Sequence, residues 1–395
     1  LNTTGSYNVA VGQAAGRDTT TGSSNTAVGT DSLVFNTTAS NNTAVGYSAL
    51  KANTTGSENT AVGTEALYTN TTAGANTAIG FRALKTNTAL YNTAVGYESL
   101  RDNTTGNQNI AVGGDTLAAN TNGEKNTAIG MQALNNNTSG HSNTASGAQA
   151  LTECTTGYYN VAIGAQALKL ATTLSSAVAV GYGSLKAVTT GSHNVGLGYD
   201  SGQLITTGTY NVVLGRRAGS SITTGSNNIC IGPTAGLNQV TGGDTNQLYI
   251  ARGAGTAGSS DVWIYGASNG ACYQGNNSSS WSTTSDRRLK KNITDNTKGL
   301  AEIDQLRVTN FEYRAKEEID MSEFPLANDP GQVVLGEGNE GIHTGIIAQE
   351  LEAILPECII ESSKGAKTVD TDPIMWALVN AVKELSAKVK ALEAK

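Results

Sequence analysis

Ser285 and Lys290 are two residues whose types and spacing could do covalent chemistry; they lie five residues apart in the segment SDRRLKKNI. A serine hydroxyl needs a base beside it to become a nucleophile at neutral pH, and a lysine amine can be that base when burial or nearby positive charge lowers its pKa. Two arginines and a second lysine flank the pair. The plain alternative is that Ser285 caps a turn or a helix while the basic residues form a solvated face.

The bond that such a pair would cut follows from ring size. Attack of the Ser285 hydroxyl on its own carbonyl would close a strained four-membered lactone. Attack on the carbonyl of Thr284 passes through a five-membered ring and gives an N→O acyl shift. We therefore favour cleavage between Thr284 and Ser285, with the Ser285–Asp286 bond as the lesser alternative.

The elements that would position this pair belong to a domain that begins near Ser285. Lys, Arg, Glu and Leu become frequent from this residue onward. Alternating residues predict a strand over 308–313. A helix is predicted over about 373–395, and a heptad seam this short needs partner helices, which favours a parallel three-stranded coiled coil over a helix packed on its own domain. The seam residues are Met375, Leu378, Val382, Leu385, Val389 and Leu392.

The C-terminal motifs resemble those of the endosialidase-type intramolecular chaperones, a family of self-cleaving domains. The resemblance rests on Ser-Asp-x-Arg-Leu-Lys at 285–290, on Gly-Ile-Ile-Ala-Gln-Glu at 345–350 and on the terminal coil, and it covers about 285–395. It implies a domain that trimerises the chain, guides folding of an upstream β-structured fibre and then cuts itself off. On the family's motif, Ser285 is the nucleophile and Lys290 the base.

His343 lies two residues before the second motif. It is a candidate for orienting or polarising the serine–lysine site, and a structural role is the alternative. We expect single-turnover self-cleavage and no other catalytic activity.

A five-residue phrase recurs fourteen times between Asn8 and Gly232: usually Asn, then Thr, Val, Ile or Ala, a small residue, an aliphatic residue and Gly. The step is 17 residues, apart from one step of 16 between Asn76 and Asn92. We number a unit from its Asn, so that NTAVGYSALKANTTGSE over 42–58 is positions 1 to 17. A fixed short period of this kind predicts a solenoid.

The chemistry of one unit predicts a coil with two short strands, at positions 2 to 4 and around positions 8 and 9. Gly at position 5 suits a corner with positive φ or a close backbone approach. Position 3 is almost always Ala, so that strand face has little volume and suggests a second and third copy of the chain pressed against it. A free-standing monomeric β-helix is the alternative.

The phrase Asn-(Thr/Val)-Ala-(Val/Ile)-Gly resembles the repeat of the left-handed β-roll heads of trimeric autotransporter adhesins. Similar arrays occur in fibres of phages and phage-like injection machines. The resemblance covers about residues 1–247.

Composition excludes several functional classes. The formal net charge is −7 without a basic patch, which argues against nucleic-acid binding. No run approaches about 18 apolar residues, so we expect no membrane insertion. The four cysteines lie far apart without a CxxC pair, so we expect free thiols, no metal site and no cofactor.

The whole chain is therefore interpreted as mainly β, in three parts: a trimeric β-roll or β-solenoid rod over 1–247, a neck over 248–284 with strands near 248–250 and 262–265, and a small α+β chaperone over 285–395. The function predicted is a homotrimeric fibre of a phage tail or a related contractile injection apparatus, made in the host cytoplasm and carried on the particle. Its N-terminal end would join baseplate or tail proteins, and its receptor would be a cell-surface glycan or protein. We expect strand pairing between the three chains.

Two alternatives stay open. A bacterial trimeric surface adhesin would share the repeats. A glycan-degrading tailspike would need two convergent carboxylates, whereas Asp31, Glu65, Glu98 and Asp115 share position 7 and predict a surface row. Aromatic residues at position 6 could stack on sugars or form a structural ladder: Tyr47, Phe81, Tyr97, Tyr182 and Tyr199.

Overall fold

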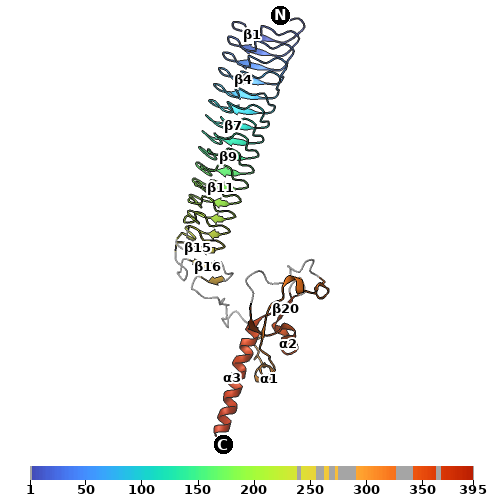
Figure 1. Cartoon of the computed structure of the whole chain (residues 1–395), viewed down its shortest axis with the longest axis vertical. Coiled ribbons are helices and arrows are strands. Elements are labelled where there is room, and N and C mark those ends of the chain that lie inside the picture. Colours follow the sequence, from blue (N-terminus) through green and yellow to red (C-terminus); the bar gives the residue numbers. More distant parts are fainter. Residues whose placement is uncertain are drawn as a thin grey trace. The chain divides into compact units, whose positions relative to one another are not determined.

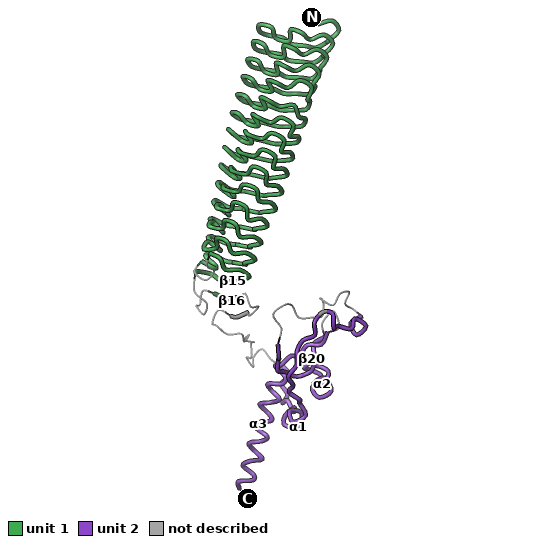
Figure 2. The backbone as a smooth tube through the Cα atoms, viewed as in Figure 1, with its two compact units in different colours: residues 1–282 green, residues 283–395 purple. Residues whose placement is uncertain are grey.

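The structure is a computed structural model that describes residues 2–237, 242–254, 262–266, 272–274, 291–325, 341–361 and 366–394. The chain divides into two compact units, residues 1–282 and 283–395 (Figure 2). The first unit is a stack of coils and the second is a small mixed domain with a terminal helix (Figure 1). The prediction of a mainly β fold built on a repeat solenoid is confirmed.

Each coil of the first unit contributes one strand of three residues, at positions 2 to 4, and each strand pairs in parallel with that of the next coil. The pairing keeps equivalent residues opposite one another, as in Thr43↔Thr60 and Ala44↔Ala61. The strands are β1 (Val9–Val11), β2 (Thr26–Val28), β3 (Thr43–Val45), β4 (Thr60–Val62), β5 (Thr77–Ile79), β6 (Thr93–Val95), β7 (Ile110–Val112), β8 (Thr127–Ile129), β9 (Thr144–Ser146), β10 (Val161–Ile163), β11 (Val178–Val180), β12 (Val195–Leu197), β13 (Val212–Leu214) and β14 (Ile229–Ile231).

The strand pairs all lie within one chain, so the expected pairing between chains is not what forms this sheet. The expected second strand is also absent from the coils. In its place lies a turn in which the Leu at position 9 has a left-handed backbone, with φ near 50° at Leu50 and Leu134. Leu rarely adopts this conformation, and its complete burial offsets the strain.

Gly at position 5 is required for both of the reasons expected of it. Gly96 has φ of 135°, and a Cβ there would lie 2.4 Å from the carbonyl oxygen of Gly113 in the next coil. The same clash recurs along the stack. Only a residue without a side chain lets successive corners approach this closely.

The Ala at position 3 points into its own coil, and the expectation that it faces another copy of the chain is wrong. Ala44, Ala61 and Ala94 are completely buried in the single chain, in the same core cluster as the position 9 leucines. The coil is so narrow that one Leu, this Ala and a small residue at position 8, such as Ala49, fill its apolar interior. Position 4 therefore points outward, and its aliphatic side chains are partly exposed, as at Ile129 and Ile163.

Two ladders of buried Asn side chains explain why Asn recurs. At position 1, the Oδ1 of Asn25 accepts from the backbone N–H of Asn42 at 3.0 Å, and the Nδ2 of Asn42 donates to the carbonyl of Gly56 at 3.0 Å. At position 12, the Nδ2 of Asn53 donates to Asn36 Oδ1 at 3.0 Å. Each coil thus satisfies buried polar groups of its neighbour, with the Oδ1 atoms of Asn70 and Asn137 as exceptions on the position 12 ladder.

The core changes chemistry along the rod. From Cys154 onward position 12 is apolar and buried, ending in Ile205 and Ile222. Position 9 stays Leu as far as Leu185 and changes to Gly only from Gly202, where a Cβ would lie 3.0 Å from a methyl group of Val213. Ile205 and Val213 pack around the space that the Leu leaves.

The 16-residue coil loses its residue at the corner between positions 13 and 15. Strand pairing continues across it, with Thr77 opposite Thr93, and Asn87 Nδ2 now donates to the carbonyl of Ala89 at 2.7 Å. The corner absorbs the deletion and the position 1 ladder continues, whereas the position 12 ladder is interrupted between Asn70 and Asn87 and resumes at Asn103.

Below the last coil, β15 (Leu248–Ala251) adds in parallel, while β16 (Val262–Gly266) and β17 (Cys272–Gln274) add antiparallel. The two strands predicted for the neck are confirmed. Among the described helices, none has the length and apolar character to cross a bilayer.

The second unit has short elements and one long helix. Strands β18 (Thr309–Phe311) and β19 (His343–Gly345) form one antiparallel pair, and β20 (Ile359–Glu361) and β21 (Lys367–Val369) another. The helices are α1 (Leu300–Ile303), α2 (Ala348–Glu352) and α3 (Thr371–Glu393), with 3-10 turns η2 (Lys316–Glu318), η3 (Met321–Glu323) and η5 (Pro356–Cys358). Its small core is centred on Leu351, Leu355 and Cys358.

Candidate functional site

The residues predicted to do the chemistry, Thr284, Ser285 and Lys290, lie outside the described residues. The structure does describe residues 291–325, which follow the predicted base, and the elements that hold them. The described elements hold the backbone that follows the predicted site.

Helix α3 anchors the segment that follows the predicted base. Asn380 Nδ2 donates to the carbonyls of Asn296 and Lys298, each at 2.9 Å. Glu384 accepts from the backbone N–H of Leu300 at 3.3 Å. Two polar side chains on one helix face thus fix the backbone a few residues downstream of Lys290, and the sequence reasoning missed both.

His343 lies on β19, directly opposite Phe311 of β18. Its ring packs beside those of Phe311, with centroids 6.1 Å apart, and Tyr313, at 5.0 Å. It is half-buried in an aromatic cluster. This cluster fixes the orientation of the ring, which is what an orienting or polarising residue needs.

A largely apolar pocket of about 750 Å³ opens beside that cluster. Phe311 and Tyr313 of the β18 segment line it, together with Ile347 before α2, Val369 of β21 and Ile374 of α3. The motif predicted from the sequence at 345–350 contributes much of the wall. The motif is therefore structural as well as diagnostic, since it brings β19 and α2 to one site.

Ion pairs hold α2 in this position. Arg307 Nε donates to Glu350 at 3.0 Å, and Lys367 Nζ contacts Glu352 at 2.5 Å. The guanidinium of Arg307 lowers the pKa of the Glu350 carboxyl below its ordinary value. Glu350 is thus a positioning group and stays ionised at neutral pH.

Helix α3 has two different faces. Ala377 and Ala381 are buried against the second unit, on the side that carries Asn380. The predicted seam points away from this side: its six residues are 44% to 69% exposed in the single chain. The alternative, that the seam packs on its own domain, is not what the structure shows.

Three of the four carboxylates predicted as a row at position 7 lie in an ion-pair ladder. Asp31 pairs with Lys51 at 3.0 Å, Glu65 pairs with Arg82 at 2.9 Å and with Lys85 at 3.0 Å, and Glu98 pairs with Arg101. Hydrogen bonds from Lys85 and Arg82 lower the pKa of the Glu65 carboxyl. A glycosidase acid needs a raised pKa, so Glu65 does not suit that role.

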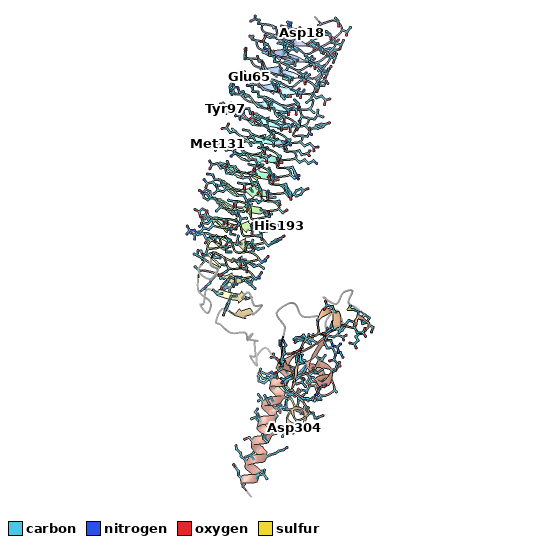
Figure 3. All side chains as sticks on the ribbon, viewed as in Figure 1. Asp18, Glu65, Tyr97, Met131, His193 and Asp304 are labelled. Atoms are coloured by element: carbon cyan, nitrogen blue, oxygen red, sulfur yellow. The ribbon has the colours of Figure 1, made fainter. Side chains whose placement is uncertain are left out.

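The aromatic row at position 6 forms ladders along one edge of the rod, where Tyr97 lies (Figure 3). Phe81 and Tyr97 stack with centroids 5.4 Å apart, and so do Tyr182 and Tyr199. Arg82 lies over the Phe81 ring at 4.7 Å. These contacts agree with the structural-ladder alternative.

Cys154, Cys230 and Cys358 are free and buried. Burial raises the pKa of the Cys154 thiol to about 11 and that of Cys230 to about 12. Burial also raises the pKa of the Cys358 thiol. Among the described residues no cluster of His, Cys, Asp and Glu could hold a metal ion.

Comparisons with a family model and with curated relatives give matches to parts of the chain. Residues 285–360 match the model of the family Peptidase_S74, described as the chaperone of endosialidase. The long tail fibre proteins Gp37 of Enterobacteria phages K3 and T2 are each 50% identical to this chain over 64 residues. These residues make up 15% of this chain and only 5% of each relative. No solved structure matches the chain.

Proposed function

We propose that this chain is a subunit of a phage tail fibre that contacts the host surface, and that its C-terminal domain is a chaperone that assembles the fibre. The observation that carries the proposal is the combination of a long coil stack with a domain of the endosialidase chaperone family. The similarity to phage long tail fibre proteins supports the same setting, with the virion tail as the location.

The fibre is a homotrimer in this proposal, and its copies meet through the outward strand face. Position 4 is aliphatic in every coil except that of Ser146, and position 2 also becomes aliphatic from Val161 to Ile229. These side chains are partly exposed in the single chain, and neither position carries a charge. Contiguous apolar surface of this kind is typical of an interaction site.

The α3 seam is the second contact between copies. Its apolar residues line one face of a 23-residue helix and are exposed in the single chain. A three-stranded coiled coil would bury them. It would also hold three chains in phase at one end while their rods form.

The chaperone then removes itself through Ser285 and Lys290. The neutral amine of Lys290 takes the proton of the Ser285 hydroxyl, and the oxygen attacks the carbonyl carbon of Thr284. The C–N bond of that peptide breaks as the nitrogen is protonated, which leaves an ester on Ser285. Water hydrolyses the ester and frees a new C-terminus at Thr284 and a new N-terminus at Ser285. Asn380 and Glu384 support this step because they fix the backbone that follows Lys290.

Expression of the full chain tests the cleavage. We expect fragments of 284 and 111 residues, which sum to the 395 of the chain. Mass spectrometry should find an N-terminal serine on the shorter one. Ser285→Ala and Lys290→Ala should each leave one full-length band, while the matched controls Ser282→Ala and Lys291→Ala should be cut normally. Continued cutting of Ser285→Ala at this bond would assign the cleavage to another residue or to a host protease.

Adsorption of the assembled protein to host cells tests the fibre itself. The mature rod should bind cells that the phage infects and should compete with the phage for them. Rods that bind no such cell would contradict the proposed function.

A further inference from the structure

One corner of the rod, at positions 16 and 17, carries a group of aromatic rings that the proposed function does not use. His141 and Tyr158 stack face to face, with centroids 5.2 Å apart and planes 7° apart, and Tyr159 meets both rings edge-on. Further along, His193 stacks on Tyr210 with centroids 4.6 Å apart and planes 10° apart. His193 is labelled in Figure 3, on the edge of the rod opposite Tyr97.

These rings sit on a backbone that disfavours them. Position 17 has positive φ, with values of 57° at Tyr159, 62° at His193 and 57° at Tyr210. A bulky side chain in this region is uncommon and costs about 1–3 kcal/mol. Tyr159 is 59% exposed and Tyr210 56% exposed, so burial does not repay that cost. Other coils carry small polar residues here, such as Ser142 and Ser176, which the corner accepts equally.

The spacing of the rings leaves an opening between the two groups. Ser175 and Ser176 occupy the corner in the coil between them. Tyr158, at position 16, turns one face to His141, so its other face points along the rod toward Ser175, and His193, at position 17, faces Ser176 from the far side. The two rings stand at adjacent positions of the corner and are two coils apart, roughly 10 Å along the rod at the usual strand spacing. That distance admits one flat ring with contacts of about 4 Å on each side.

The corner carries no Asp, Glu, Lys or Arg over this stretch. From His141 to Tyr210 positions 16 and 17 hold only His, Ser, Tyr and Thr. The charged pair Glu124 and Lys125 lies one coil beyond. In contrast, the opposite edge carries the ion-pair ladder and an arginine over its aromatic row. Ring faces flanked by hydroxyls without charge suit a neutral ligand that has one apolar face and several hydroxyls.

The geometry points to a binding site for a neutral hexose unit of a cell-surface glycan, between Tyr158 and His193 over Ser175 and Ser176. The C–H face of the sugar stacks on the rings, and the serines meet its hydroxyls. The inference rests on the proposed role in host recognition and names the ligand class and place of that recognition.

Saturation-transfer NMR on the full chain tests the site, with neutral oligosaccharides of glucose, galactose and N-acetylglucosamine as probes. At least one probe should receive saturation from the protein. Tyr158→Ser and His193→Ser should each weaken its binding about tenfold, the loss of one stacking contact. Ser176→Tyr should also abolish binding, because it fills the opening with a residue that this position accepts in other coils. Tyr97→Ser removes a ring of similar exposure from the opposite edge and should leave binding unchanged.

Several results would overturn the inference. Wild-type protein that binds none of the probes would do so, as would equal losses in Tyr97→Ser and Tyr158→Ser. If Tyr158→Ser instead lowers the assembled mass in light scattering, the rings are a contact between copies. Host adsorption separates this failure from that of the proposed function: rods that still adsorb without binding sugars at this corner would keep the fibre role and lose only the site.

Discussion

At the scale of single residues, the repeat is explained by side chains that serve the neighbouring coil. The position 1 and position 12 Asn residues satisfy buried backbone and side-chain groups one coil away. The Thr at position 13 donates its hydroxyl to the equivalent carbonyl of the next coil, as Thr37 does to Thr54 at 3.2 Å. Because each of these residues completes a neighbour, the motif must recur with little change.

The position 5 glycines give the sharpest stability prediction. Gly96→Ala places a Cβ at φ of 135° and 2.4 Å from the Gly113 carbonyl oxygen. We expect a loss of about 1–3 kcal/mol from strain alone, before the clash is added. Thermal unfolding of Gly114→Ala is the control, since a Cβ there meets nothing within 4 Å. Equal melting temperatures for the two variants would contradict the close approach of the corners.

The ion-pair ladder predicts a loss of stability in acid. The pKa of the Glu65 carboxyl is lowered from its ordinary value of 4.5 by Lys85 and Arg82. Its contribution is therefore fully present above pH 4.5 and is lost as the pH falls through the lowered pKa. We expect Glu65→Gln to destabilise the rod at pH 7 by about 1 kcal/mol or less.

The same variant should lose less stability than the natural chain between pH 5 and pH 2. Circular dichroism melts at each pH measure this. Glu58→Gln, at an exposed carboxyl, should keep the full pH dependence. A Glu65→Gln rod with unchanged acid sensitivity would show that the ladder does not cause it.

At the scale of elements, the period predicts the coil but not which way its faces point. Alternation over positions 2 to 4 defines two strand faces, and Ala at position 3 fits either a narrow interior or a close interface. The recurring Leu at position 9 indicates the direction of the face, because a buried Leu needs packing partners inside its own coil. Ala94 is one of these partners, in the same core cluster as the leucines. The prediction of a second strand was wrong for a different reason. Leu rarely adopts a left-handed backbone conformation, so its local preference does not predict this turn, and packing in the assembled core stabilises it.

The features of the C-terminal domain were also predicted only in part from the sequence. Its motifs predict the family, which the match over 285–360 supports. The anchoring by Asn380 and Glu384 joins residues 84 and 82 positions apart in the chain, which no local pattern encodes. The seam was visible because its period is local, and its exposure agrees with a need for partner helices.

The exposed seam predicts the effect of a charge on assembly. Val382 is 59% exposed in the single chain, so Val382→Glu should leave the domain folded. Three carboxylates at one level of a coiled coil should repel, and light scattering should show monomers or weakly associated chains. Ala387→Glu adds the same charge to an exposed position off the seam and should remain trimeric. Trimers in both variants would remove α3 from the assembly interface.

At the scale of the whole molecule, the role proposed for the chaperone is to align three rods, and not to guide strand pairing between chains. The strands pair within each chain at a local separation of 17 residues, so forming a coil stack needs no partner. The difficulty is the axial alignment of the rods. Because the coils are alike, two rods can associate with a shift of one coil and bury almost the same outward face. A trimerising domain at one end removes that ambiguity.

Deletion of residues 285–395 therefore tests the chaperone role. We expect chains that form coils yet associate out of phase, seen as mixed masses or insoluble protein. The uncut Ser285→Ala chain should give uniform trimers, since assembly does not need the cleavage. Electron microscopy and light scattering distinguish the two outcomes. Uniform trimers from the gene truncated after Thr284 would contradict the chaperone reading.

The corner that absorbs a missing residue in the 16-residue coil has an evolutionary consequence. Strand register survives there although one residue is gone, and whole units of 17 can be exchanged without disturbing either Asn ladder. Unequal recombination between the near-identical repeats upstream of Cys154 should therefore change the reach of the fibre in steps of one coil. The downstream coils, where Gly202 depends on Val213 and Ile205, are matched to one another and should be inherited as a block. Rod length and core chemistry can then vary at separate places in the gene.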